Sequence, residues 1–175
     1  MTITLVPYNS DYLELICAWR QDPVVRQYNP VDIVTSRVLH ARFSGAASDF
    51  DNFENATLIF WLIKNDDAPV GNISMKDINK RMLTAEIGYG VAPEARGNGY
   101  ATEAVRLVTQ RAFTESPLRR LIAYVHEGNL ASRRVLEKVG YQPEGVLREH
   151  YIVNGEPVNE IIYGILEREV RPALS

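Results

Sequence analysis

The chain has 175 residues, of which 46% are hydrophobic and 23% charged, and its formal net charge is −3. A chain of this length and composition is expected to fold as one domain, residues 1–175, around a full hydrophobic core. The net negative charge lacks the general basic footprint of a nucleic-acid-binding protein. The longest apolar run, residues 58–63, is far too short to cross a bilayer, so no membrane partner is expected.

A lone cysteine, Cys17, excludes an intrachain disulfide and fits a reducing compartment. The first residues have neither the basic start nor the long apolar stretch of a signal peptide. We therefore expect a cytoplasmic protein. Three scattered histidines do not have metal-ligand spacing, so no metal site is expected.

The N-terminal third reads as two helices and a loop. Residues 10–23 predict the first helix, with Ser10 or Asp11 as the N-cap and Pro23 beyond its end. A second helix is expected to start at Thr35. The following stretch, residues 44–55, is polar and small and is predicted to be a loop.

Strand patterns begin after this loop. Three strands are predicted, of which the first two form a hairpin: residues 57–63, 70–75 and 83–91. The next segment is a helix with one apolar face, formed by Ala101, Ala104, Val105, Val108 and Ala112. Residues 120–125 are continuously apolar, which is typical of a strand buried on both faces.

A short helix over residues 130–139 and a closing hairpin complete the chain. The hairpin pairs residues 146–153 with residues 159–166 through Asn154-Gly155, a favourable turn. The order of helices, antiparallel strands, a strand–helix–strand–helix segment and a hairpin predicts a mixed α/β domain with a parallel step.

The segment Arg96-Gly97-Asn98-Gly99-Tyr100-Ala101 lies between the third strand and the long helix. A helix N-terminus offers free backbone N–H groups and about half a positive charge. Glycines let this backbone approach a phosphate closely, and Arg96 adds a charge. The segment therefore indicates an anion-binding loop, although a plain glycine-rich turn would show the same glycines.

A dinucleotide-binding loop is the rival interpretation. The loop differs by one residue from the pattern G-x-G-x-x-G, and Glu127 follows the next strand where a ribose-binding acid could lie. Thr102, however, replaces the third glycine, and the preceding helices and hairpin are not a repeating βαβ unit. No Lys-Ser or Lys-Thr pair follows the glycines, which excludes a P-loop.

The pattern Arg96-x-x-Gly99-x-Ala101 resembles the Arg/Gln-x-x-Gly-x-Gly/Ala motif of the GNAT acyltransferases. Residues 85–91 resemble the strand before that motif, and residues 128–149 resemble the helix and strand after it. The outer segments, residues 19–28 and 151–166, resemble the RimJ/RimL branch, which acetylates the N-termini of ribosomal proteins.

The resemblance implies a GNAT-like fold: a mostly antiparallel twisted sheet with a parallel strand–helix–strand step and flanking helices. It also implies acetyl-coenzyme A as co-substrate, with its pyrophosphate on the glycine loop and its pantetheine arm on the strand edge. The cofactor-binding residues carried over are Val91, Arg96, Gly97, Asn98, Gly99, Tyr100, Ala101 and Asn129.

Two catalytic residues are carried over, Ser132 and Glu86. Ser132 stands in the family's Asn-x-x-Ser/Ala motif and is the candidate for the leaving thiolate, although it also suits the first turn of a helix capped by Asn129. Leu136 stands where many GNAT enzymes have a tyrosine that serves as the general acid. Tyr141, in the family's Gly-Phe position, is expected to pack in the core.

Glu86 is the candidate base because it lies on the strand beside the cofactor, although it would equally suit a structural carboxylate. His126 ends the strand at the expected cleft, with a surface position as its alternative. Tyr151 stands where the RimL-like pattern has a glutamate.

The function expected is direct acetyl transfer to a primary amine, foremost the N-terminal α-amine of a ribosomal or other protein. A small-molecule amine, such as an amino sugar, polyamine or aminoglycoside, and a non-catalytic acyl-coenzyme A sensor are the alternatives. Near the last hairpin, Glu149, Glu156 and Glu160 could attract a cationic amine or form a solvated edge. Open strand edges would permit a homodimer.

Overall fold

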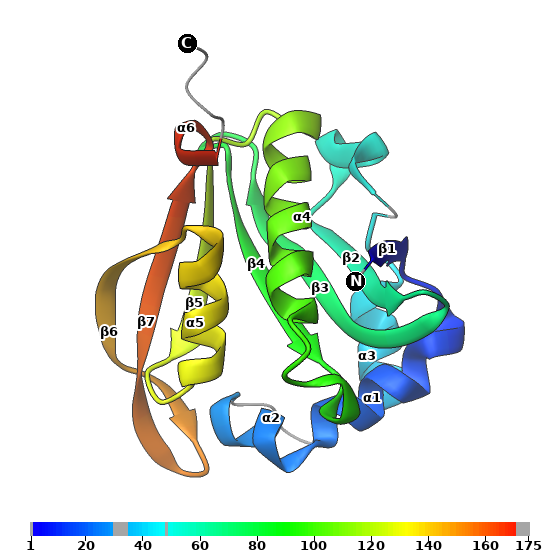
Figure 1. Ribbon diagram of the computed structural model, residues 1–175, viewed down its shortest axis with the longest axis vertical. Helices are drawn as coiled ribbons and strands as arrows, with labels where there is room; N and C mark the ends of the chain where they lie inside the picture. The colour runs from blue at the N-terminus through cyan, green and yellow to red at the C-terminus, as the bar shows by residue number, and fades with distance from the viewer. Residues whose placement is uncertain (1, 30–34, 48, 171–175) are drawn as a thin grey trace.

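The computed structural model describes residues 2–29, 35–47 and 49–170. They form a seven-stranded sheet in the order β1-β2-β3-β4-β5-β7-β6 (Figure 1). The strands are β1 (Ile3–Pro7), β2 (Leu58–Asn65), β3 (Ala68–Asn79), β4 (Thr84–Val91), β5 (Arg120–His126), β6 (Gln142–Val153) and β7 (Glu156–Leu166). Among these seven strands, β4 and β5 pair in parallel and the other neighbours pair antiparallel. The predicted mixed α/β class is confirmed.

The helices cover both faces of this sheet. They are α1 (Leu13–Gln21), α2 (Pro23–Tyr28), α3 (Ser36–Phe43), α4 (Tyr100–Glu115), α5 (Leu130–Val139) and α6 (Glu167–Val170). Short 3₁₀ turns are η1 (Ser10–Tyr12), η2 (Phe50–Asn55) and η3 (Pro93–Ala95). In Figure 1, α4 and α5 lie in front of the sheet, and α2 lies below it.

Neighbouring residues of β2 show which helices cover which face, because successive side chains of a strand point to opposite sides. Phe60 packs on Phe43 of α3, with ring centroids 4.1 Å apart. Trp61 packs on Phe50, with centroids 5.6 Å apart, and the Arg111 side chain of α4 lies over that same Phe50 ring. Helix α3 therefore covers one face of the sheet and α4 the other.

The first helix is shorter than predicted and starts differently. Neither Ser10 nor Asp11 is the N-cap of α1, because that position is taken by Tyr12, which makes no side-chain capping bond. Asn9 caps the preceding turn η1, and its Oδ1 accepts a hydrogen bond from the Asp11 backbone N–H at 3.1 Å. The chain then makes one 3₁₀ turn before α1 begins. The prediction that the helix ends before Pro23 is confirmed, and Thr35 is the N-cap of α3.

Two elements of this region were not predicted. β1 pairs with β2 but is only five residues long, which gives a weak period-two signal. Helix α2 starts at Pro23 itself: Asp22 caps it by accepting from the backbone N–H groups of Val24 and Val25, at 3.0 and 3.3 Å. A proline suits the first position of a helix, because the N–H it lacks has no helical partner there.

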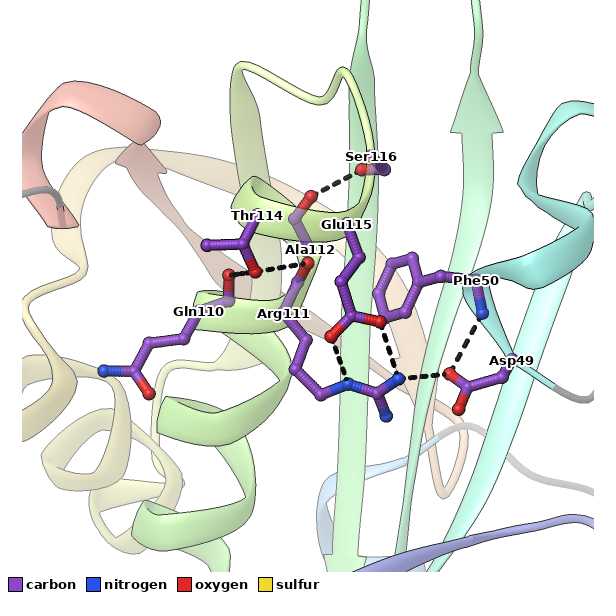
Figure 2. Close-up of polar contacts among 8 residues, drawn as sticks. All are labelled: Asp49, Phe50, Gln110, Arg111, Ala112, Thr114, Glu115 and Ser116. Atoms are coloured by element: carbon purple, nitrogen blue, oxygen red, sulfur yellow. Dashed lines mark hydrogen bonds and ion pairs between the residues drawn. The ribbon is translucent and has the colours of Figure 1, made fainter.

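The predicted loop over residues 44–55 is wrong in its second half, where η2 buries Phe50 and Phe53. Figure 2 shows what holds this turn to α4. The Arg111 guanidinium donates to Asp49 Oδ1 at 2.8 Å and to Glu115 Oε1 at 2.7 Å, and its Cζ atom lies 5.2 Å from the centre of the Phe50 ring. The turn is thus stabilised by long-range contacts that its local composition does not reveal.

β5 also differs from its prediction. Its residues alternate between buried and half-buried, so only one face is covered completely. Leu121, Ala123 and Val125 are buried, whereas Tyr124 and His126 line a cavity on the other face. The continuous apolar run misled the interpretation because Ile122 and Tyr124 are only half-buried, and Tyr124 lies at the wall of the cavity.

Candidate active site

β4 and β5 separate after a short parallel ladder. Residues 84–86 of β4 face residues 120–122 of β5, and the register records no later pair between the two strands. Past this point one edge of β4 still pairs with β3, while the edge toward β5 is open. A cavity of about 460 Å³ lies here and is lined by residues 86–91 of β4 and 123–126 of β5.

The sheet register puts several polar side chains on one wall of this cavity. Lys76 of β3 lies opposite Glu86, which lies beside Ile122, so these three residues share a face. Tyr124 and His126 follow on the same face, because side chains alternate along β5. The ring of Tyr28 from α2 packs against His126, with centroids 5.3 Å apart, and closes this side.

Glu86, the predicted base, lies on this wall. Its side chain is 13% exposed, and its Oε1 atom is 2.8 Å from Lys76 Nζ. Burial raises the pKa of Glu86, and the ion pair with Lys76 opposes that rise. The Glu86 carboxylate is therefore more basic than that of an exposed glutamate.

A second carboxylate, Glu160, lines the same cavity from β7. It is 6% exposed, and its Oε2 atom is 2.8 Å from His150 Nδ1 of β6. Glu160 was predicted only as one of three acidic residues near the hairpin, and the other two, Glu149 and Glu156, are exposed. Tyr151, which stands where the RimL-like pattern has a glutamate, lines the cavity with 38% of its surface exposed.

His126 lines the cavity but is not placed as a free base. Its Nδ1 atom accepts a hydrogen bond from the Gly128 backbone N–H at 3.0 Å, and its ring packs on Tyr28. The neutral imidazole therefore carries its proton on Nε2. The histidine is a half-buried wall residue rather than the surface residue that was its alternative interpretation.

Ser132 lies on the other side of the sheet opening, in the first turn of α5. Its backbone N–H donates to Asn129 Oδ1 at 3.1 Å, so Asn129 is the helix N-cap that the sequence indicated. Its Oγ atom is 2.8 Å from the Tyr89 hydroxyl oxygen of β4, and the Tyr89 hydroxyl donates to the Ser132 carbonyl at 3.1 Å. Both Ser132 and Asn129 line the cavity.

Tyr89 is a cavity residue that the sequence analysis missed. Burial raises the pKa of its phenol, so the group stays protonated and acts as a hydrogen-bonding partner of Ser132. The sequence carried one signal for this role, a tyrosine on the strand that precedes the glycine loop. Tyr141 packs in the core as expected, and its hydroxyl is 2.9 Å from Thr109 Oγ1. Leu136, for which no packing was predicted, is fully buried.

The glycine loop leads from β4 into α4, and both glycines adopt positive φ. The φ angles of Gly97 and Gly99 are 82° and 81°, in the left-handed region that favours glycine. Gly99 is the N-cap of α4 and offers no side-chain hydrogen bond to the first turn. The first backbone N–H groups of the helix therefore lack a side-chain acceptor, which is the arrangement that binds an anion.

Arg96 and Asn98 lie around this loop. The Asn98 side-chain amide donates to the carbonyls of Ala95 and Arg96, at 3.2 and 3.3 Å, and so shapes the turn. Arg96 Nη2 donates to Asp22 Oδ1 at 2.6 Å, and this hydrogen bond lowers the pKa of Asp22. The loop is thereby tied to the start of α2. Of the predicted residues, the cavity lining brings together Glu86, Val91, Asn129 and Ser132, while residues 96–101 follow directly after Val91.

A model of the acetyltransferase (GNAT) domain matches residues 2–142. The chain belongs to the GNAT acetyltransferase family. The match covers most of the chain, including the open edge of β4, the glycine loop and the first turn of α5. The resemblance read from the sequence is thus confirmed at the level of the family.

Three relatives from Bacillus subtilis match parts of this GNAT chain. The uncharacterized N-acetyltransferase YoaA is 37% identical over 111 residues, which are 62% of this chain and 63% of YoaA. The probable N-acetyltransferase YjcK is 45% identical over 52% of this chain and 51% of its own length. The putative ribosomal N-acetyltransferase YdaF is 36% identical over 59% of this chain and 57% of its own. The chain spans half to two thirds of these relatives.

Solved structures share the GNAT fold over nearly the whole chain. Mycobacterium smegmatis RimJ in complex with CoA-disulfide has a TM-score of 0.84 and 23% identity, over 97% of this chain and 84% of that one. Spermidine N-acetyltransferase from Vibrio cholerae, in complex with CoA and spermine, has a TM-score of 0.82 and 19% identity, over 96% and 97%. At these identities the likeness concerns the fold.

GNAT acetyltransferases use acetyl-coenzyme A, and the residues present here fit that co-substrate. The uncapped first turn of α4 suits a pyrophosphate. The open edge of β4 offers backbone groups to the amides of a pantetheine arm, as a strand edge does to a peptide. The co-substrate predicted from the sequence is the one that this family uses.

No group of three or more His, Cys, Asp or Glu side chains in the described ranges is placed to hold a metal ion. Within the same ranges, no helix has both the length and the apolar character needed to cross a bilayer.

Proposed function

We propose that this chain is an acetyl-coenzyme A-dependent N-acetyltransferase, formed by a single domain of residues 1–175, and that it acetylates the N-terminal α-amine of a protein. One observation carries the proposal. The cavity at the opening between β4 and β5 is lined both by a half-buried carboxylate, Glu86, and by the hydrogen-bonded hydroxyls of Ser132 and Tyr89. Direct transfer requires a proton acceptor for the amine and a proton donor for the leaving thiolate.

Glu86 is assigned as the proton acceptor. An amine reaches the site mainly as its ammonium form and must lose a proton before it can attack a thioester. Because burial raises the pKa of Glu86, its carboxylate is a better acceptor than an exposed glutamate. Lys76 holds the carboxylate at 2.8 Å and keeps it oriented on the cavity wall.

Ser132 is assigned to the leaving side. Acetyl-coenzyme A supplies the acetyl group as a thioester, and its sulfur leaves as a thiolate. Since the Tyr89 hydroxyl donates to the Ser132 carbonyl, the Ser132 hydroxyl is left as the donor in the contact between the two oxygens. A serine hydroxyl rotates freely, so Ser132 can turn the same proton toward the cavity.

The loop residues 96–101 are assigned to binding of the co-substrate. Gly97 and Gly99 take the positive φ angles that aim backbone N–H groups outward, and no side chain caps the first turn of α4. Arg96 adds a positive charge at the entrance, and Asn129 and Val91 line the cavity that continues from this loop. These residues support a pyrophosphate at the loop and a pantetheine arm along β4.

The acceptor is proposed from proton chemistry and from relatives. An α-amino group has a pKa of about 8 and a lysine about 10.4, so about a tenth of α-amines but well under a hundredth of lysines are neutral at neutral pH. A partly buried glutamate can deprotonate the α-amine more readily. The relative YdaF, a putative ribosomal N-acetyltransferase, supports the same choice.

A polyamine is the second candidate, because the buried carboxylate of Glu160 lines the cavity together with Glu86. Two carboxylates on one wall could attract a cationic chain, and one structural neighbour is a spermidine N-acetyltransferase. A homodimer through an open sheet edge stays a prediction, which light scattering of the purified chain would test.

A thiol-release assay with acetyl-coenzyme A tests the proposal. The panel contains peptides with free N-termini, the same peptides N-terminally blocked but carrying lysine, spermidine, amino sugars and aminoglycosides. We expect turnover on free N-termini and none on blocked ones. Turnover only on spermidine or another small amine would show that the acceptor is a small molecule and not a protein. Silence on every amine, with coenzyme A still bound in a calorimeter, would indicate an acyl-coenzyme A sensor instead.

A further inference from the structure

Two arginines from different helices line the cavity, and no carboxylate among the described residues forms an ion pair with either of them. Arg20 lies in the last turn of α1 and Arg42 in the last turn of α3. Arg20 is half-buried: its Cζ atom lies 5.7 Å from the centre of the Phe43 ring, and its buried Nε atom has no hydrogen-bond partner among the described residues.

The two guanidinium groups are close enough to affect each other. Burial lowers the pKa of Arg20, and the positive charge of Arg42 lowers it further. Both effects disfavour the charged form, so the pair costs free energy in the absence of an anion. A costly pair of like charges in a cavity indicates binding of an opposite charge.

The other charges of the cavity do not neutralise this pair. Glu86 is bound to Lys76, and Glu160 is bound to His150. Within the part of the chain that the structure describes, no carboxylate forms an ion pair with Arg20 or Arg42. One part of the cavity is therefore lined by paired carboxylates, and another part by arginines that pair with no described carboxylate.

We propose that the acceptor carries an anionic group, a carboxylate or a phosphate, beside its amine, and that Arg20 and Arg42 bind this group. The inference rests on the proposed function and names the class of its substrate. A guanidinium binds a carboxylate or a phosphate through two parallel hydrogen bonds, so the pair would fix the acceptor's orientation as well as its affinity.

This assignment separates the candidate acceptors. A peptide whose first residues are acidic has the required carboxylate near its α-amine, and a phosphorylated amino sugar has a phosphate. Spermidine has no anionic group and would bring further positive charge toward the two arginines. The site is thus expected to select against polyamines even though Glu160 lines the same cavity.

The test compares matched acceptors that differ only in the anion. A peptide beginning Ala-Asp is compared with one beginning Ala-Asn, and glucosamine 6-phosphate with glucosamine. We expect kcat/KM to favour the anionic member of at least one pair by about 10- to 100-fold, the range for a hydrogen bond to a charged group. The preferred pair identifies the source of the anion, peptide carboxylate or sugar phosphate.

Arg42→Gln is the first variant, because Arg42 is exposed and its loss should leave the fold intact. It should raise KM for the anionic acceptor and leave the neutral one unchanged. Arg37→Gln, an exposed arginine on the same helix that does not line the cavity, is the matched control. Arg20→Gln should behave like Arg42→Gln, and Arg20→Lys keeps the charge if the glutamine variant folds poorly.

A binding measurement separates this inference from the proposed function. Calorimetry with the N-acetylated product peptides, acidic against neutral, reports anion recognition without turnover. If no amine is acetylated but the acidic peptide still binds more tightly and Arg42→Gln removes the difference, the anion site stands and the transferase proposal fails. Equal kcat/KM and equal binding within both pairs would overturn the inference, as would a preference that persists in the Arg20→Gln, Arg42→Gln double variant.

Discussion

Two arginines of this molecule lie over phenylalanine rings, and their surroundings are opposite. Arg111 lies 5.2 Å from the centre of Phe50 and is bound by Asp49 and Glu115 (Figure 2). Arg20 lies 5.7 Å from the centre of Phe43, and the positive charge of Arg42, which lines the same cavity, lowers its pKa. The contact with the ring is therefore not what distinguishes the two sites. The difference lies in whether neighbouring carboxylates neutralise the guanidinium.

The comparison separates stability from function. At the C-terminal end of α4, positive and negative charges are matched, so Arg111 connects the helix to η2 and leaves no charge for a ligand. In the cavity, Arg20 and Arg42 are left unmatched by the described residues, and Glu86 is kept half-buried. Substitutions in the cavity should mainly alter turnover, and substitutions around Arg111 should mainly alter stability.

The largest effect is expected for Glu86→Gln. Loss of the proton acceptor should lower kcat by about 100-fold or more, the usual contribution of a general base. Because burial raises the pKa of Glu86, the wild-type rate should rise with pH through a limb above the ordinary carboxyl range, and this limb should vanish in the variant. The melting temperature should hardly change. A full loss in Glu160→Gln with activity retained in Glu86→Gln would transfer the role of base to Glu160.

The next effect is expected for Ser132→Ala. Removing a hydrogen bond to a developing thiolate should lower kcat by about 10- to 100-fold, with little change in KM for the acceptor. Tyr89→Phe keeps the serine hydroxyl but removes its partner, so its loss should be smaller. Steady-state kinetics with a fast-reacting acceptor would check the order. Equal rates in wild type and Ser132→Ala would show that Ser132 has only a structural role, in the first turn of α5.

Arg111→Ala should destabilise the chain without touching catalysis. Losing both ion pairs and the contact with Phe50 should lower the free energy of unfolding by about 1 to 2 kcal/mol. The control is Arg106→Ala on the same helix. Arg106 pairs with the exposed Glu103, and its loss should change stability by less than about 0.5 kcal/mol. Denaturant unfolding measures both. A drop in kcat at unchanged stability would contradict the division between the two regions.

The smallest effect is expected from salt. Raising the ionic strength from about 0.1 to about 1 M should raise KM for an anionic acceptor severalfold, because charges that meet a ligand from solution are screened. KM for the matched neutral acceptor should stay constant. The ion pairs of Arg111 are already in contact and partly buried, so the melting temperature should respond less. If KM rose equally with salt for the anionic and the neutral acceptor, charge attraction would not explain how the cavity binds the anionic one.

Regular elements with strong local signals could be predicted from the sequence. Helix α5 has the predicted limits, Leu130–Val139, because Asn129 caps its start and Gly140, with φ of 108°, ends it. The glycine loop was recognised because positive φ angles and an uncapped helix start depend on neighbours in sequence. By contrast, η2 depends on Arg111, which lies about sixty positions later, and no local pattern reveals that contact.

The candidate site shows the same limit. Ser132 could be named from its motif, but its partner Tyr89 is 43 residues away and meets it only through the packing of α5 on β4. Arg20 did leave a local signal, because it lies one helical turn after the buried Ile16 on the inward side of α1. An arginine on an apolar helix face is a residue to question, and the sequence analysis did not question it. That Arg42 lines the same cavity as Arg20 could not be predicted, because it depends on how α1 and α3 pack in the fold.

Asp22 has a consequence that reaches beyond its own hydrogen bonds. The same carboxylate caps α2, whose Tyr28 and Val25 line the cavity, and accepts a hydrogen bond from Arg96 of the glycine loop. Any ligand that draws Arg96 toward itself changes the surroundings of that cap. By thermodynamic reciprocity, whatever the loop's ligand does to the affinity for the acceptor, the acceptor must do equally to the affinity for the loop's ligand. Under the proposed function, Asp22 would therefore couple binding of the co-substrate at the loop to binding of the acceptor in the cavity.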